Sequence, residues 1–118
     1  MNIIDANRKH IEAALEYSGG THDFDDVRDG ILSGKMQLWP GERSAVVTEI
    51  VEYAKKRTLH VFLAGGDLDE LLGGMGDAIA WGRAQGCNAM TLSGRRGWEK
   101  VLGKHGFHAT RIVMERDI

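Results

Sequence analysis

Apolar and polar residues recur with a helical period near the start of the chain. Residues 5–17 carry apolar side chains at helical spacing and end at Gly19-Gly20, which predicts a short amphipathic helix. A second helix is predicted from about residue 23 to Gly34, with Thr21 or Asp23 as its N-cap. The acidic run that opens this helix suits the positive end of a helix dipole, and it lacks the spacing of a calcium loop.

The pattern then changes to the period of two that is typical of strands. Residues 36–39 and 43–53 are predicted to form two strands joined by a turn at residues 40–42, and residues 58–64 a third. The second of these strands is largely apolar on both faces, so we expect it to be central and covered on both sides.

A strand, a glycine turn and a helix follow one another in residues 58–86, and the rest of the chain is organised around this unit. Residues 67–85 carry an apolar stripe at helical spacing, with Asp67 and Glu70 placed as a capping box. Three glycines interrupt this pattern at positions 73, 74 and 76. Each destabilises a helix by about 1 kcal/mol relative to alanine. They indicate either close backbone packing or a break in the helix.

A second, shorter unit completes the predicted fold. Residues 90–93 are predicted to be a strand, residues 97–105 a helix and residues 107–115 a last strand. We therefore expect one α/β (α+β) domain over residues 1–118, with a mixed, mainly antiparallel sheet of five to six strands and helices on both faces. Neighbouring strand ends that splay apart in such a sheet would leave a cleft for function.

Charge distribution and cysteine content indicate the environment in which the protein is expected to work. Residues 1–82 hold 8 Lys and Arg against 14 Asp and Glu, whereas residues 83–118 hold 7 against 3, so the C-terminal part is basic. Cys87 is the single cysteine, which excludes an intrachain disulfide and fits a reducing compartment. With neither a signal peptide nor a membrane span in the pattern, we expect a soluble cytoplasmic protein.

The order of predicted elements resembles the GNAT superfamily of acyl-CoA-dependent N-acyltransferases. The most specific stretch is GCNAMTLSGRRGWEKVLGKHGF, residues 86–107, which is similar to the second half of that fold. Short segments such as QLW at residues 37–39 and GRRGW at residues 94–98 also resemble small phage-encoded GNAT-like proteins. The resemblance implies a GNAT-like fold, and the phage proteins imply a place in the host cytoplasm or the virion.

The cofactor loop implied by the resemblance is poorly matched. GNAT enzymes hold the pyrophosphate of CoA on a Gln/Arg-x-x-Gly-x-Gly/Ala loop at a helix N-terminus. At that place this chain has Ala64, Gly65 and Gly66, which leave room for a cofactor, followed by the carboxylates of residues 67, 69 and 70, which would repel a diphosphate. The expectation is no cofactor, with acetyl-CoA as the alternative.

Catalytic groups are also sparse. Where the family often places a Tyr that protonates the departing thiolate, four residues before Gly-Phe, this chain has Leu102, which cannot donate a proton. Glu49 and His60, on adjacent predicted strands, are the candidate general bases, either acting through water. A polar pair on the sheet surface is the alternative interpretation of these two residues.

A basic helix carries the candidate partner surface. Its residues are Arg95, Arg96, Trp98, Lys100 and Lys104. They could bind phosphate or an acidic protein surface, or form a solvated helix face with Trp98 in the core. A nucleic-acid-binding protein would need more basic charge and an element that reads the bases. His105 and His108 are spaced so that they could bind a metal ion, but no further ligand accompanies them in the sequence.

Two functions follow from this sequence. The first is a non-catalytic GNAT-fold protein, encoded by a phage and associated with the virion, that binds a protein partner. The second is an acetyl-CoA-dependent N-acetyltransferase acting on an amine, with Glu49 or His60 as the base.

Overall fold

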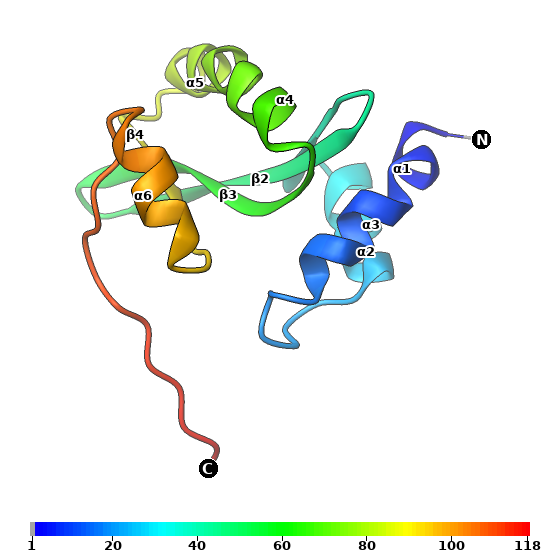
Figure 1. Ribbon diagram of the computed structural model, residues 1–118, viewed down its shortest axis with the longest axis horizontal. Coiled ribbons are helices and arrows are strands. Elements are labelled where there is room, and N and C mark those ends of the chain that lie inside the picture. Colours follow the sequence, from blue (N-terminus) through cyan, green and yellow to red (C-terminus); the bar gives the residue numbers. More distant parts are fainter. Residues whose placement is uncertain (1) are drawn as a thin grey trace.

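The computed structural model describes residues 2–118 and is built on a four-stranded sheet with strand order β1-β2-β3-β4 (Figure 1). The strands are β1 (Met36–Pro40), β2 (Ser44–Tyr53), β3 (Lys56–Gly66) and β4 (Ala89–Leu92). The first three pair antiparallel and form the predicted meander, whereas β4 pairs parallel to β3. β2 lies between two partners, which confirms its prediction as a central strand.

Helices cover both faces of this sheet (Figure 1). On one face lie α1 (Ile3–Ala6), α2 (Arg8–Leu15) and α3 (Phe24–Leu32), and on the other α4 (Leu68–Gly73) and α5 (Met75–Ala84). A last helix, α6 (Gly97–Gly103), follows β4. The mixed α/β class and the helices on both faces are as predicted.

Two apolar cores hold these layers together. The larger core joins α1, α2 and α3 to the sheet and buries Ile4, Ile11, Phe24, Val27, Ala45, Val47 and Leu63. The smaller joins α5 to β3 and buries Leu59, Ala78 and Cys87, with Trp39 and Trp81 packed against them. Cys87 is a buried thiol inside this core.

Polar side chains determine where the first helices begin and end. The segment predicted as one helix over residues 5–17 is divided at Asn7, a buried residue whose side-chain amide donates to the Ile3 carbonyl at 2.8 Å. Asp23 is the N-cap of α3, and Asp23 and Asp26 accept from each other's backbone N–H in a complete capping box. Thus the acidic run stabilises a helix start.

The helix predicted over residues 67–85 is broken. Its two parts meet at Gly74, which ends α4 and precedes α5. A Cβ at Gly73 or Gly76 would meet no atom within 4 Å, so these glycines are not required by close packing. Of the two interpretations of the glycine cluster, the break is the one found.

The prediction of a last strand over residues 107–115 is wrong. In the described part of the chain, residues 107–118 form no helix or strand and extend away from the domain as a tail (Figure 1). The sheet therefore has four strands rather than the five to six predicted. The residue pattern of this segment is typical of a strand. A strand must also pair with a neighbouring strand, and the local sequence pattern cannot show whether it does.

Candidate functional site

A cavity of about 470 Å³ opens where β3 and β4 part. The two strands pair only from Thr58 to Val61 on β3, yet β3 continues to Gly66. At Val47 and Thr48 of β2 the partner on β3 jumps from Leu63 to Val61, a bulge that leaves Phe62 as the extra residue. The cleft expected from splayed strand ends therefore exists.

The wall of this cavity is mainly apolar and comes from every layer of the fold. β1 supplies Trp39, β3 supplies Val61, and β4 supplies Leu92. Helices and turns add Tyr17, Leu71, Met75, Trp98 and Leu102. Such a wall suits an apolar group and offers few polar contacts to fix its orientation.

A polar chain stiffens the floor of the cavity. The indole N–H of Trp39 donates to Thr48 Oγ1 at 2.9 Å, and this hydroxyl donates to Gln37 Oε1 at 2.8 Å. Trp39 also meets Trp81 of α5 edge to face, with ring centroids 5.7 Å apart. Trp39 and Thr48 line the cavity, and nothing in the sequence pattern indicated that they would meet.

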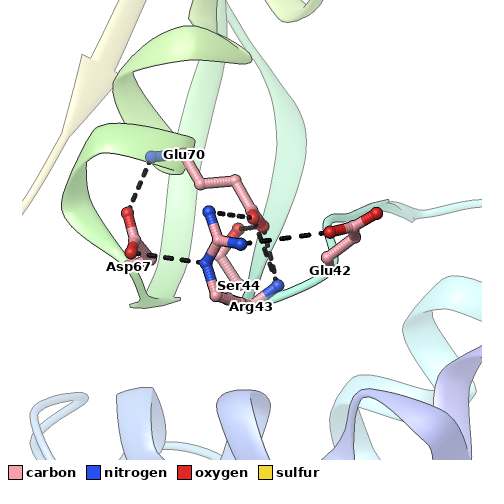
Figure 2. A network of polar contacts seen from close by, with 5 residues as sticks. All are labelled: Glu42, Arg43, Ser44, Asp67 and Glu70. Carbon is pink, nitrogen blue, oxygen red and sulfur yellow. Dashed lines mark hydrogen bonds and ion pairs between the residues drawn. The ribbon is translucent and has the colours of Figure 1, made fainter.

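Ser44 and Glu70, which line the cavity, belong to a network of polar contacts with Arg43 and Asp67 (Figure 2). Glu70 accepts the Arg43 backbone N–H at 3.0 and 3.2 Å and the Ser44 hydroxyl. Asp67 accepts the Glu70 backbone N–H at 3.0 Å and lies 3.5 Å from the Arg43 guanidinium. This arrangement confirms Asp67 as the N-cap of α4, while the Glu70 side chain binds the β1–β2 turn instead of closing a reciprocal box.

Asp67 and Glu70 of this network are ionised at neutral pH. The hydrogen bond from the Glu70 backbone N–H lowers the pKa of Asp67 below its usual value. The hydroxyl of Ser44, followed by the Arg43 backbone N–H, lowers the pKa of Glu70. The positive end of α4 is thus already capped by the ionised side chain of Asp67.

The three residues predicted to bind a cofactor lie in different surroundings. Ala64 lines the cavity, whereas Gly65 and Gly66 are not among the described residues that do. A Cβ at Gly65 would lie 2.6 Å from the His10 carbonyl oxygen, and one at Gly66 would lie 2.2 Å from the Arg43 carbonyl oxygen. Both glycines therefore allow the chain to pack on itself.

The two candidate bases are neighbours, but they do not line the cavity in the part of the chain described. Glu49 and His60 are paired across β2 and β3. Since side chains alternate along a strand, they point away from Thr48 and Val61, which do line the cavity. His60 Nδ1 lies 2.9 Å from the Thr91 hydroxyl, and burial, partly offset by Glu49, lowers the pKa of His60 and favours the neutral ring.

The residues of the predicted partner surface point in different directions. Arg96 precedes α6, Lys100 lies on it and Lys104 follows it, and all three are exposed. Trp98 is half-buried and lines the cavity. Arg95 stacks on Tyr17, with its guanidinium carbon 4.1 Å from the ring centroid. Sequence reasoning missed this contact because the two residues lie far apart along the chain.

Comparisons with solved structures identify the fold. Glucosamine-6-phosphate N-acetyltransferase from Arabidopsis thaliana aligns with a TM-score of 0.63 at 16% identity, covering 99% of this chain and 94% of its own. The wild-type protein TTHA1254 from Thermus thermophilus aligns with a TM-score of 0.62 at 15% identity, covering 97% and 92%. An acetyltransferase from Trypanosoma brucei aligns with a TM-score of 0.59 at 15% identity, covering 94% of each chain.

This protein has the GNAT fold. No protein-family model matches the chain, and no curated protein matches it either. At 15 to 16% identity the similarity concerns the GNAT fold alone. The GNAT resemblance of the sequence is confirmed at the level of the fold.

Among residues 2–118, no group of three or more His, Cys, Asp or Glu side chains is placed to hold a metal ion. None of the helices in that range is long and apolar enough to cross a bilayer.

Proposed function

We propose that this GNAT-fold protein is a non-catalytic binding protein whose apolar cavity and adjoining helix α6 receive a protein partner. One observation carries the proposal: the Asp67 carboxylate already caps the positive end of α4, and the Glu70 carboxylate lies beside it, bound to the β1–β2 turn. A CoA diphosphate at this end would have to displace the Asp67 carboxylate and would be repelled by both acids.

The surroundings of the cavity support the same function. Glu49 and His60 project away from Thr48 and Val61, so a base acting on a substrate in the cavity would have to reach it from the other side of β2 and β3. Leu102 is buried and lines the cavity at the position where the family resemblance would place a tyrosine. Glu70 and Asp77 also line the cavity, and Glu70 is already bound by the Ser44 hydroxyl and the Arg43 backbone N–H. A mainly apolar wall that lacks Glu49, His60 and a tyrosine at position 102 suits binding better than proton transfer.

The partner proposed here presents apolar side chains to the cavity and carries acidic residues beside them. Trp98 of α6 lines the cavity, while Lys100 on the same helix and Arg96 and Lys104 at its two ends are exposed to solvent. A basic rim beside an apolar pocket steers an acidic partner and orients it. A phage virion is the setting that the sequence resemblance implies for such a partner.

Calorimetric titration with acetyl-CoA tests the proposal. We expect binding weaker than about 100 μM, or about −5.5 kcal/mol. The matched control is the variant Ala64→Trp, which fills the cavity from β3. A low-micromolar dissociation constant that is lost in Ala64→Trp would contradict the proposal, because it would show a cofactor in this cavity.

Acetyl-CoA-dependent N-acetylation of an amine is the second candidate, favoured by the position of the cavity. From Phe62 to Gly66, β3 has no neighbouring strand among residues 2–118 on the side where β4 ended, so its backbone groups there can pair with an extended ligand. Acetyl transfer to a panel of amines, lost in Glu49→Gln or His60→Gln, would support this function. Transfer unchanged in both variants would exclude these residues as bases.

A further inference from the structure

Arg95 is the only basic residue among the described residues that line the cavity. Within residues 2–118 its guanidinium takes part in no ion pair and no side-chain hydrogen bond. Four arginines elsewhere in the fold are held in ion pairs, namely Arg8, Arg28, Arg43 and Arg57. Since a guanidinium carries five N–H donors in one plane, Arg95 offers donors at the border of the cavity that the protein itself does not use.

Tyr17 holds this guanidinium in place. The guanidinium carbon of Arg95 lies 4.1 Å from the centroid of the Tyr17 ring, and Tyr17 also lines the cavity. The ring covers one face of the guanidinium, whereas the N–H donors point outward in the guanidinium plane. The contact therefore positions the cation and leaves its donors open to a ligand.

The turn between β4 and α6 places Arg95 beside the aromatic wall of the cavity. The Trp98 backbone N–H donates to the Arg95 carbonyl at 3.0 Å. A Cβ at Gly94 would lie 3.1 Å from Trp98 Cδ1, so the indole packs on this glycine. One turn of the chain thus supplies both a cation and an apolar surface to the same cavity.

The two acidic residues that line the cavity come from other elements. Glu70 belongs to α4 and is bound by the Ser44 hydroxyl and the Arg43 backbone N–H, and Asp77 is exposed on α5. Both acids would repel an anionic group, whereas Arg95 would attract it. A ligand that combines an apolar group with one carboxylate would therefore bind with the carboxylate toward the β4–α6 turn.

We propose that Arg95 recognises a carboxylate of the partner, and that Tyr17 is the residue that positions Arg95 for this contact. The inference rests on the proposed function, in which an apolar side chain of a protein partner enters the cavity. The carboxylate belongs to an Asp or Glu side chain next to that apolar residue in the partner. A guanidinium with open donors binds such a group through two parallel N–H···O bonds, and a neutral amide cannot replace it.

Two peptides of equal size test this proposal on the full chain. The probes are acetyl-Leu-Phe-Glu-amide and acetyl-Leu-Phe-Gln-amide, which differ in one carboxylate. Titrations followed by the indole N–H signals of Trp39 and Trp98 in NMR spectra give the two dissociation constants. We expect the Glu peptide to bind about three- to tenfold more tightly at low salt, and this ratio to fall as salt rises.

Substitutions at three positions assign the preference to Arg95 and Tyr17. Arg95→Met should reduce the ratio of the two dissociation constants to about one, because it removes the donors and keeps the apolar stem. Arg83→Met removes the same charge from an exposed residue of α5 that is not among the described residues lining this cavity, so it should keep the ratio. Tyr17→Leu should lower the ratio, whereas Tyr17→Phe should keep it, since the ring that covers the guanidinium is retained.

The outcomes separate this inference from the proposed function. Equal binding of the two peptides that is lost in Ala64→Trp would overturn the role of Arg95 and leave the proposed function in place. A preference for the Glu peptide that persists in Arg95→Met, or no change of the indole signals with either peptide at millimolar concentration, would also overturn the inference. Displacement of both peptides by low-micromolar acetyl-CoA would contradict the proposed function itself.

Discussion

The guanidinium carbon of Arg95 lies 4.1 Å from the centroid of the Tyr17 ring. Tyr17 belongs to the turn after α2, and Arg95 to the connection between β4 and α6, so the contact joins two segments that border the cavity. Because both side chains are exposed to solvent, the stacking should contribute modestly to stability.

A double-mutant cycle should measure that contribution. We expect Tyr17→Leu and Arg95→Met, each of which keeps an apolar stem, to show a coupling energy of about 0.5–1 kcal/mol in urea unfolding. Arg96→Met, at the neighbouring exposed arginine, serves as the control for loss of charge and should not couple to Tyr17→Leu. A coupling energy near zero for the stacked pair would mean that the contact does not stabilise the fold.

Asp67→Ala should destabilise the protein by about 0.5–2 kcal/mol, because it removes the N-cap of α4 and its hydrogen bond from the Glu70 N–H. Urea unfolding followed by circular dichroism measures the change. Asp69→Ala is the control, since Asp69 is an exposed acid in the same helical turn. If both variants lose the same free energy, the effect of Asp67 is that of its charge rather than of its cap.

The carboxylate of Glu70 should make the protein less stable in acid. Its pKa is lowered in the folded state by Ser44, so the unfolded chain binds its proton first as the pH falls. The stability that Glu70 contributes is fully present above the unfolded pKa, about 4.3, and is lost as the pH falls through the folded value. The urea midpoint should drop less steeply between about pH 5 and pH 3 in Glu70→Gln than in the wild type. Equal slopes would exclude this role.

Gly65→Ala should destabilise the protein by about 1–3 kcal/mol, because the new Cβ would lie 2.6 Å from the His10 carbonyl oxygen and push α2 from the sheet. Gly73→Ala is a matched control in open space and should be neutral or stabilising by up to about 1 kcal/mol. Thermal unfolding of the two variants gives the comparison. A Gly65→Ala protein as stable as the wild type would show that this glycine is not required for packing.

Two changes on α6 should separate partner binding from stability. Reversing Arg96 and Lys100 to Glu should change the free energy of unfolding by less than about 0.5 kcal/mol, since both are exposed, yet abolish co-purification with an acidic partner. Trp98→Ala should cost about 1–2 kcal/mol, less than a fully buried tryptophan, because Trp98 is half-buried in the cavity wall. Assembly that survives the charge reversal would place the binding surface elsewhere.

The sequence by itself determined most of the local structure of this protein. Its hydrophobic periods and glycines predicted the meander of β1, β2 and β3. Its acidic residues predicted the helix caps at Asp23 and Asp67. These features depend on residues that are near one another in the chain, so propensity and hydrogen bonding within a few positions decide them. The GNAT fold could be inferred for the same reason, from the order of elements.

The tertiary structure decided which of these elements act together. Arg43, Ser44 and Glu70 meet because the β1–β2 turn packs on the start of α4, and Tyr17 reaches Arg95 across the layers of the fold. The last strand predicted over residues 107–115 failed because strand pairing requires a partner edge, which a local period cannot specify. The cavity likewise depends on where β4 stops pairing with β3, a property of register and not of composition.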